Sequence, residues 1–436
     1  MAASLPIDTA IWSLRASETY VPLPFPDRVV IVATSVPTDS DGVACSFSLM
    51  RGDAVLYSND SGKCTVGLQG QTSAGASKHN FKIKVKNANK DKVALRFDTW
   101  DENTSFTVKA YGSIPGNATA FDRSMIREAV CLELWRQIRR NDPNNPGHIA
   151  PWYARLNRTT TRFQQPQFSC DCHALSVYFQ LPTDSAPQFY GCYVLRSDNT
   201  NATYLIDDSN AQHYLLQPQH GGADLWTNKG NLSTAVWEFS SPANPDMAVP
   251  GRLLNWFASI MAGTGSWADY AQYLGLASWI DYIIHIEVVG SFDSTLNNIM
   301  LKSYTGTEAS GLWEVDSYDL DESLGVKWGA PSGVAPDMTG WASDGANVFQ
   351  AMRNAFLPQI QARYAYLRRS GVLSPETMAG LIRRYATFRV ADLEQDWVLY
   401  GTNSIASYRY IQDWYEGRIA WLDAQWGYSA EVGRDG

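Results

Sequence analysis

Apolar residues in the first 115 positions come in short runs that alternate with polar residues or are rich in β-branched side chains. The runs RVVIVATSV, VACSFSLM, DAVLYS and FKIKVK are separated by Asp, Gly, Ser and Asn. A period of two residues is typical of β-strands, and the separating residues are typical of turns. The pattern therefore predicts a β-rich N-terminal part over residues 1–115.

The hydrophobic period then changes to that of a helix. Residues 122–140 carry a broad apolar stripe that ends at NDPNNPG, which predicts a helix there. The runs ALSVYFQL, FYGCYVLRS and ATYLIDD, within residues 170–216, again have the pattern of strands. Residues 252–261 and 267–290 return to helical spacing. We therefore expect a mixed core over residues 116–330.

The following segments have equally clear patterns. NIMLKSYT and LWEVDSYDL flank the turn GTEASG, which predicts a β-hairpin. Three helices are expected over residues 347–371, 374–395 and 404–426, and the second opens with Ser374 as N-cap and Pro375 at the first helical position. The sequence thus predicts an α+β protein of two lobes, with a C-terminal helical region over residues 331–436.

Composition narrows the classes of function. The chain has 436 residues and a formal net charge of −9, which argues against general binding to nucleic acid or to anionic membranes. Sixteen Trp and 22 Tyr suit large protein interfaces, but they suit a well-packed core equally. The six cysteines lack the CxxC spacing of a zinc site, which predicts free buried thiols. The N-terminus lacks the pattern of a secretory signal, so we expect synthesis in a cytoplasm.

An acid–amide–acid arrangement lies within residues 292–325. Asp293 precedes Asn298 by five residues, and Asp319 and Asp321 follow the expected hairpin. Phosphoryl transfer needs an acid that orients the attacking hydroxyl, a role that suits Asp293. It also needs oxygen ligands for Mg²⁺, a role that suits Asn298 and the two later acids, which would point the same way on an extended segment. Turn capping is the alternative interpretation of these residues.

A second candidate is the Gly- and Ser-rich stretch GLQGQTSAGASKHNFKIKVKN. Backbone N–H groups around Gly70 and Ser73, followed by the ammonium of Lys78, are suited to contact phosphates. A surface hairpin with solvated lysines is the alternative interpretation. His285, one helical turn after Asp281, suits a hydrogen-bonded core position better than a catalytic one.

Taken in order, these pieces resemble the CotH family of spore-coat and secreted kinase-like proteins. LQGQTSAGASKH looks like the family's RGxSS…KK stretch, and DRSMIR is similar to its D-x-S-x-x-R helix start. YGCYVLR resembles the G-x-Y-x-L strand, WIDYIIHIEVVGSFDSTLNN resembles the helix and acid–Asn–Asn turn, and DLDESLG looks like D-x-D-x-S-F-G. The resemblance covers roughly residues 25 to 325. Gln69 and His79 stand where the family has an arginine and a second lysine.

The resemblance implies a reduced, atypical protein-kinase-like fold that binds ATP with Mg²⁺ and phosphorylates protein serine. By position, Asp293 would be the catalytic acid, with Asn298, Asp319 and the supporting Asp321 at the metal and Lys78 at the phosphates. Domains of this family also occur in phage structural proteins, so we expect a virion- or tail-associated component that retains Mg–ATP binding, made in the host cytoplasm. Its partners would be other particle proteins in a multi-subunit assembly, with no nucleic acid and no membrane. An active serine kinase and a carbohydrate- or receptor-binding module are the alternatives.

Overall fold

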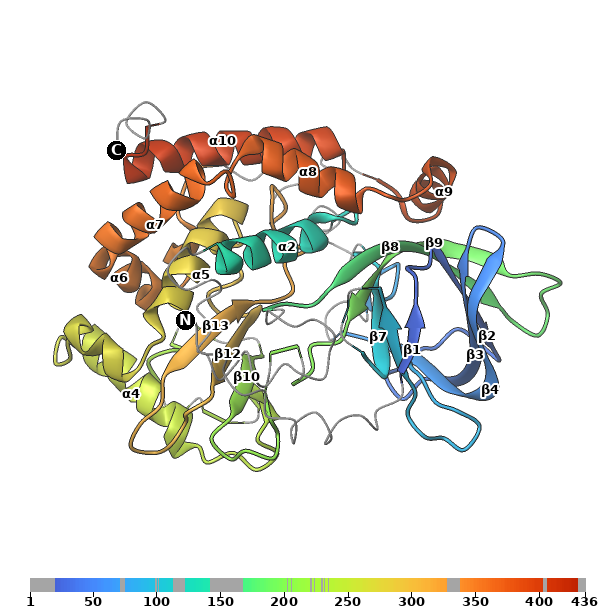
Figure 1. The fold of residues 1–436 in the computed structure, drawn as a ribbon, viewed down its shortest axis with the longest axis horizontal. Coiled ribbons are helices and arrows are strands. Elements are labelled where there is room, and N and C mark those ends of the chain that lie inside the picture. Colours follow the sequence, from blue (N-terminus) through green and yellow to red (C-terminus); the bar gives the residue numbers. More distant parts are fainter. Residues whose placement is uncertain are drawn as a thin grey trace, which may run out of the picture.

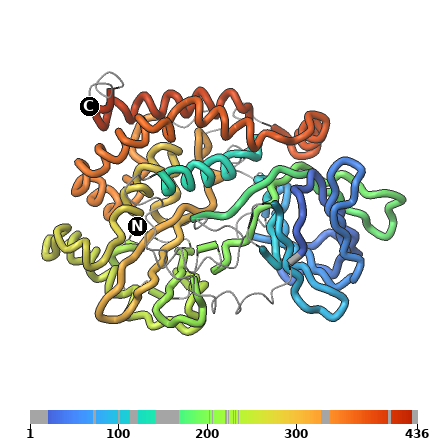
Figure 2. Tube along the Cα trace, viewed as in Figure 1, coloured from blue at the N-terminus to red at the C-terminus, as the bar shows by residue number. Residues whose placement is uncertain are grey.

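The computed structural model combines a β-barrel with a larger, mostly helical part (Figure 1). It describes residues 20–429 except for 71–74, 99, 101, 113–121, 142–167, 202, 205, 220–221, 223, 229, 231, 234, 328–337 and 403–405. In the tube of Figure 2, the blue strands lie in the barrel at the right and the red last helix runs along the top of the helical part. The expected α+β class, with a β-rich N-terminal part and a helical C-terminal part, is confirmed.

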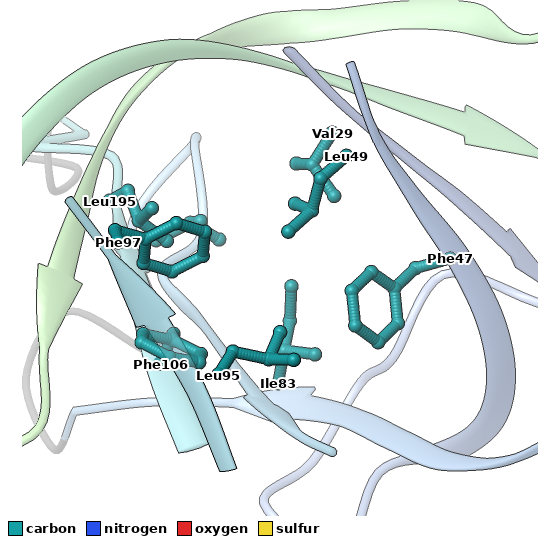
Figure 3. A pocket seen from close by; sticks show the side chains of 9 residues that line it. Val29, Phe47, Leu49, Ile83, Leu95, Phe97, Phe106 and Leu195 are labelled. Carbon is teal, nitrogen blue, oxygen red and sulfur yellow. The ribbon is translucent and has the colours of Figure 1, made fainter. Parts of the chain in front are cut away.

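The barrel closes through seven strands in the order β2-β3-β4-β5-β7-β9-β8. The strands are β2 (Arg28–Ala33), β3 (Val43–Arg51), β4 (Ala54–Leu68), β5 (Phe81–Lys84), β7 (Ser105–Lys109), β8 (Cys172–Gln180) and β9 (Gln188–Ser197). Two further strands, β1 (Tyr20–Leu23) and β6 (Ala94–Phe97), pair in parallel beside it. Apolar side chains such as Phe47, Phe97 and Phe106 fill the interior (Figure 3). The barrel therefore takes its last two strands from beyond residue 115.

A separate four-stranded sheet carries the predicted hairpin. Its order is β11-β10-β12-β13, with β10 (Tyr214–Pro218), β11 (Trp237–Ser241), β12 (Ile299–Ser303) and β13 (Trp313–Ser317). The hairpin is confirmed, because Ile299 pairs with Ser317 and Ser303 with Trp313. The strand expected at ATYLIDD is wrong, since Thr203 and Tyr204 lie in turns.

Helices cover one side of this sheet, and one of them, α9, lies beside strand β9 of the barrel (Figure 1). They are α2 (Arg127–Arg140), α4 (Ala248–Met261), α5 (Leu276–Val289), α6 (Asn347–Ala355), α7 (Leu357–Arg369), α8 (Pro375–Tyr385), α9 (Val390–Tyr400) and α10 (Tyr408–Trp426), with 3₁₀ turns η4 (Trp267–Gln272) and η5 (Ala342–Gly345). The helix expected over 347–371 breaks at Phe356, because Pro358 has no N–H for a helical hydrogen bond. The helix expected over 374–395 is likewise two helices, α8 and α9.

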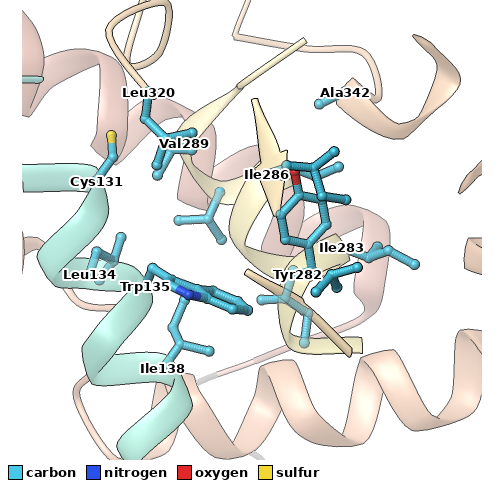
Figure 4. Packing of buried hydrophobic residues seen from close by; sticks show 14 of the residues in the cluster. Cys131, Leu134, Trp135, Ile138, Tyr282, Ile283, Ile286, Val289, Leu320 and Ala342 are labelled. Atoms are coloured by element: carbon cyan, nitrogen blue, oxygen red, sulfur yellow. The ribbon is translucent and has the colours of Figure 1, made fainter. Parts of the chain in front are cut away.

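Helix α5 lies at the centre of the helical core. Twelve of its 14 residues are buried, among them the charged Asp281 and Glu287, whose carboxylates pair with Arg139 and Arg418. Trp135 of α2 packs edge-on against Tyr282 of α5, with ring centroids 5.9 Å apart (Figure 4). The Tyr282 hydroxyl in turn donates a hydrogen bond to the Ser294 carbonyl oxygen at 2.7 Å, which connects this packing to the turn that contains Asp293.

Strand β9 contributes side chains to both hydrophobic cores. Tyr193 and Leu195 belong to the barrel core, while Cys192 and Val194 belong to the helical core. Successive side chains of a strand point to opposite faces, so one strand serves both cores. All six cysteines are free and buried, as the sequence predicts. No helix in the described part of the chain is both long and apolar enough to cross a membrane.

Candidate functional site

The turn between α5 and β12 holds the first predicted acid. Helix α5 ends at Gly290, whose positive φ of 64° turns the chain toward Asp293. The side-chain amides of Asn297 and Asn298 donate hydrogen bonds to the two carboxylate oxygens of Asp293, at 3.0 and 3.1 Å. Both bonds use the amide nitrogen, which leaves the Asn298 amide oxygen oriented as an acceptor.

The hairpin brings this turn beside the second pair of acids. The Tyr318 N–H donates to the Asn298 carbonyl oxygen at 3.3 Å, so Asn298 and Asp319 lie at the same end of β12 and β13. Both residues have positive φ values, 55° and 49°. The segment that carries Asp319 and Asp321 is therefore not the extended strand that the sequence predicts, since β13 ends at Ser317.

Asp319 connects this hairpin to the barrel. Its Oδ1 lies 2.7 Å from the Lys109 ammonium and 3.3 Å from Arg196 Nη1. Burial alone would raise the pKa of Asp319, but the charges of Lys109 and Arg196 outweigh this effect and lower the pKa to about 2. About 30% of the Asp319 side chain stays exposed, so the acid is paired and still reachable from solvent.

Two more acids surround this pair. Burial and the negative charge of Asp319 raise the pKa of Asp321 to about 7. Glu128 of α2 is fully buried; its Oε1 accepts a hydrogen bond from Arg196 and its Oε2 accepts one from the Tyr111 hydroxyl, both at 2.5 Å. The site thus places the acids Glu128, Asp319 and Asp321 together with the cations Lys109 and Arg196 between the barrel and the hairpin.

These residues fit a magnesium ion by donor chemistry. Mg²⁺ is usually bound by one or two carboxylates together with water and substrate phosphates. Asp319, Asp321 and the amide oxygen of Asn298 supply such a set. In the part of the chain that the structure describes, no three His, Cys, Asp or Glu residues form a closed metal cage. A set of carboxylates and one amide oxygen suits an ion that also binds phosphate oxygens.

Lys78 lies away from these acids. Its ammonium is fully buried, lies 2.5 Å from the Asp396 carboxylate and donates to the Cys192 carbonyl oxygen. Burial lowers the pKa of Lys78 to about 8, although Asp396 opposes this shift. The structure therefore brings Lys109, and not Lys78, to Asp319. Gly70 is exposed with a φ of 100°, and Ser73 lies outside the described residues.

Sequence reasoning missed Lys109, Glu128 and Arg196. Glu128 directly follows the DRSMIR motif, in which Asp122 binds the Arg127 guanidinium at 2.6 Å and accepts a hydrogen bond from the Arg127 N–H at 2.8 Å. This buried pair sets the start of α2 and thereby the position of Glu128. Arg196 is the last residue of the YGCYVLR motif, so this motif could have identified it as a site residue. No local sequence pattern could have identified Lys109, because its partner Asp319 is 210 residues away.

His285 occupies the core position that the sequence predicts. It is fully buried, and its Nε2–H donates to the Cys131 carbonyl oxygen at 2.9 Å. Its Nδ1 accepts a hydrogen bond from the Ser317 hydroxyl at 2.8 Å. These partners select the neutral ring.

Comparison with known proteins gives one finding of direct relevance. A family model described as CotH kinase protein matches residues 66–422. This span contains the barrel strands β5, β7, β8 and β9, the hairpin and all the site residues named above. No curated protein matches the chain.

Proposed function

The chain belongs to the CotH kinase protein family, and from this premise we propose that it binds a nucleoside triphosphate with Mg²⁺ and transfers a phosphoryl group to a protein hydroxyl. The fold would then be a reduced protein-kinase-like fold, with the nucleotide between the barrel and the helical part. The observation that carries the proposal is the convergence of Asp293, Asn298 and Asp319 at one end of the hairpin, opposite Lys109 of the barrel.

Each residue has a defined part in this proposal. Asp319, Asp321 and the Asn298 amide oxygen would hold Mg²⁺, which when bound neutralises charge on the phosphates. Lys109 and Arg196 exchange part of their contact with Asp319 for phosphate oxygens, because both are cations beside the metal site. Asp293, held by two amides, accepts the proton of the attacking hydroxyl.

The test is calorimetric titration of the chain with Mg–ATP. We expect binding by the wild type and at least about tenfold weaker binding by Asp319→Asn, which loses a charged metal ligand. Asp53→Asn is the matched control, because Asp53 is a fully exposed acid on the β3–β4 hairpin. The wild type should also gain thermal stability with nucleotide. Absence of wild-type binding at millimolar Mg–ATP would contradict the proposal.

We propose a second candidate function, that of a virion- or tail-associated structural component in which this site stabilises the fold. The specific observation is that Asp319 is already neutralised by two cations, as in a structural ion-pair network. This candidate predicts that the chain is present in purified particles and that Asp319→Asn impairs particle assembly without any loss of a phosphorylated product. Absence of the chain from particles would contradict it.

The carbohydrate-binding alternative finds no support in the surface. Sugar grooves usually present exposed aromatic rings. No Trp or Tyr side chain is exposed among the residues that the structure describes, and the exposed large hydrophobic residues there are Val, Leu and Met. The abundant aromatic residues instead pack the cores.

A further inference from the structure

Two of the six buried cysteines lie opposite each other in the barrel. Strands β3 and β4 pair antiparallel, and Cys45 and Cys64 are register partners across this pair. Both belong to the barrel core, where Cys45 is 2% exposed and Cys64 is 0% exposed. The other four cysteines belong to the helical core. The barrel therefore contains one close pair of thiols that the proposed phosphoryl transfer does not use.

The two thiol side chains lie on the same face of the sheet. Cys45 is two residues from Phe47, which points into the barrel interior (Figure 3). The irregularity in the β3–β4 pairing places its extra residues in β4, so the alternation of β3 continues from Cys45 to Phe47. Cys64 is two residues from Val66, which is fully buried in the same core. Since side chains two residues apart along a strand share a face, both thiols face the interior.

The separation of such a pair suits a disulfide. Residues directly opposite in an antiparallel pair have Cα atoms about 4.5 or 5.5 Å apart, depending on whether they exchange hydrogen bonds. A disulfide usually has a Cα separation of about 4.4–6.8 Å, so both cases lie within its range. In the reduced chain Cys64 Sγ makes weak hydrogen bonds with the Lys86 N–H and carbonyl oxygen, each at 3.4 Å. The bridge would replace these weak contacts.

We propose that Cys45 and Cys64 are a redox-controlled cross-link site, which a small-molecule disulfide oxidises while the barrel folds. One thiolate first attacks the small disulfide, forms a mixed disulfide with it and releases one small thiol. The second thiolate then attacks the protein sulfur of this mixed disulfide, which closes the Cys45–Cys64 bond and releases the second small thiol. The two protein thiols thus lose two electrons and two protons, and the small disulfide is reduced to two thiols.

Oxidation has to precede burial. The thiolate is the reactive form of cysteine, and burial raises the pKa of Cys45 to about 12 and also raises the pKa of Cys64. The folded barrel in addition closes both side chains off from solvent. The redox conditions during folding therefore decide the state of the pair, and the folded chain retains it. We expect a bridge after folding in an oxidising compartment and two thiols after folding in a reducing one.

The test is refolding of the full chain from urea, either with a reducing dithiol or with a mixture of oxidised and reduced glutathione. After denaturation and alkylation we expect six free thiols in the first sample. The second sample should have two fewer and one linked peptide pair, which contains Cys45 and Cys64. The bridge closes a loop of about 20 residues, so it should raise the midpoint of thermal unfolding by about 3–5 °C. The folded, reduced chain should keep its six thiols when oxidised glutathione is added for the same time.

Cys45→Ala and Cys192→Ala are the matched variants. Each removes one buried thiol, but Cys192 lies opposite Ser176 of β8 and not opposite a cysteine. After oxidative refolding, Cys45→Ala should give neither the linked peptide pair nor the rise in midpoint, whereas Cys192→Ala should give both. The peptide map of the wild type decides the proposal even where a variant does not refold.

Six free thiols in the oxidatively refolded wild type, or a linked pair made of other cysteines, would overturn the proposal. A linked pair that persists in Cys45→Ala, a bridge that leaves the midpoint unchanged, or rapid oxidation of the folded, reduced chain would do so as well. The inference concerns the covalent state of the barrel, and none of these outcomes depends on nucleotide binding.

Discussion

Two lysines of the barrel differ in what surrounds their ammonium groups. Lys78 is bonded to Asp396 inside the protein, whereas Lys109 meets Asp319, whose side chain is partly exposed. A buried pair contributes to the position of α9, and breaking it leaves an uncompensated charge. A pair whose carboxylate is partly exposed to solvent can exchange partners when a phosphate arrives. Residue type alone does not distinguish these roles.

We predict opposite effects for the two lysine substitutions. Lys78→Met should lower the free energy of unfolding by about 3 kcal/mol, because it removes one partner of a buried ion pair, and should leave Mg–ATP affinity within about twofold. Lys109→Met should weaken Mg–ATP binding by about tenfold or more, through loss of a charge-assisted contact. Calorimetry and urea unfolding measure both quantities. A loss of nucleotide affinity in Lys78→Met alone would assign the phosphate contact to Lys78.

His285 predicts a pH dependence of stability. Burial lowers the pKa of His285 to about 3, against about 6.5 in an unfolded chain. As pH falls below 6.5 the unfolded chain takes up a proton that the folded chain does not, so this stability is present above pH 6.5 and lost as pH falls toward 3. The wild type should lose about 2 kcal/mol through this group between pH 7 and pH 5.

The variant His285→Gln lacks this titration and supplies the comparison. Its deficit in unfolding free energy relative to wild type should be smaller at pH 5 than at pH 7 by about 2 kcal/mol. Urea unfolding at the two pH values measures the difference. An equal deficit at both values would mean that the pKa of His285 is the same in the folded and the unfolded chain.

At the scale of single elements, the glycine that ends helix α5 is constrained both by its backbone conformation and by its packing. Gly290 adopts the left-handed conformation at its C-terminal end, and a Cβ there would lie 2.4 Å from Trp414 Cη2 of α10. Gly427 ends α10 in the same conformation, with φ of 69°, but a Cβ there would meet nothing within 4 Å. The two glycines share a backbone requirement and differ only in their packing.

We therefore predict that Gly290→Ala is the more damaging of the two substitutions. Gly427→Ala should cost about 1 kcal/mol for the left-handed backbone, and Gly290→Ala about 3 kcal/mol or more, because the clash with Trp414 adds an overpacking cost. Thermal unfolding compares them directly. Since Gly290 directs the chain to Asp293, Gly290→Ala should also weaken Mg–ATP binding. Equal losses of stability at the two sites would show that Trp414 and helix α10 move aside without a cost in unfolding free energy.

For the whole molecule, β9 and the charged contacts connect the barrel to the helical part. One strand contributes to both hydrophobic cores, and the ion pairs of Lys78, Lys109 and Arg196 cross between the two parts. A substitution that destabilises one core should therefore destabilise the other core as well.

We predict that the barrel and the helical part unfold together in one transition. Leu49→Ala in the barrel core and Ile283→Ala in the helical core should each cost about 2–5 kcal/mol and should lower the same calorimetric transition by several degrees. Val55→Ala, at an exposed barrel position, should leave it unchanged. Two separate transitions, with only one displaced by each variant, would show that the cores are independent.

Local patterns in the sequence were sufficient to predict many of the helices and strands. The helical stripes of α2 and α5, the β12–β13 hairpin and the Ser374 cap, whose hydroxyl accepts from the Thr377 N–H at 3.1 Å, all depend on residues close together in the chain. The DAVLYS pattern predicts a strand that ends before NDSGKC, which has the composition of a turn. Strand β4 nevertheless continues to Leu68, because Cys64, Thr65 and Val66 pair again with β3 beyond an irregularity between Cys45 and Phe47.

The candidate site likewise has a part that the sequence predicts and a part that only the tertiary structure determines. The sequence by itself determined that Asp293, Asn298, Asp319 and Asp321 lie near one another, because a short hairpin separates them. Only the tertiary structure decided which cations they meet, since Lys109 is 210 residues from Asp319 and Lys78 is 318 residues from Asp396. Hydrophobic periodicity records which face of an element is buried, but not which distant element covers it. Barrel closure and helix packing make that choice.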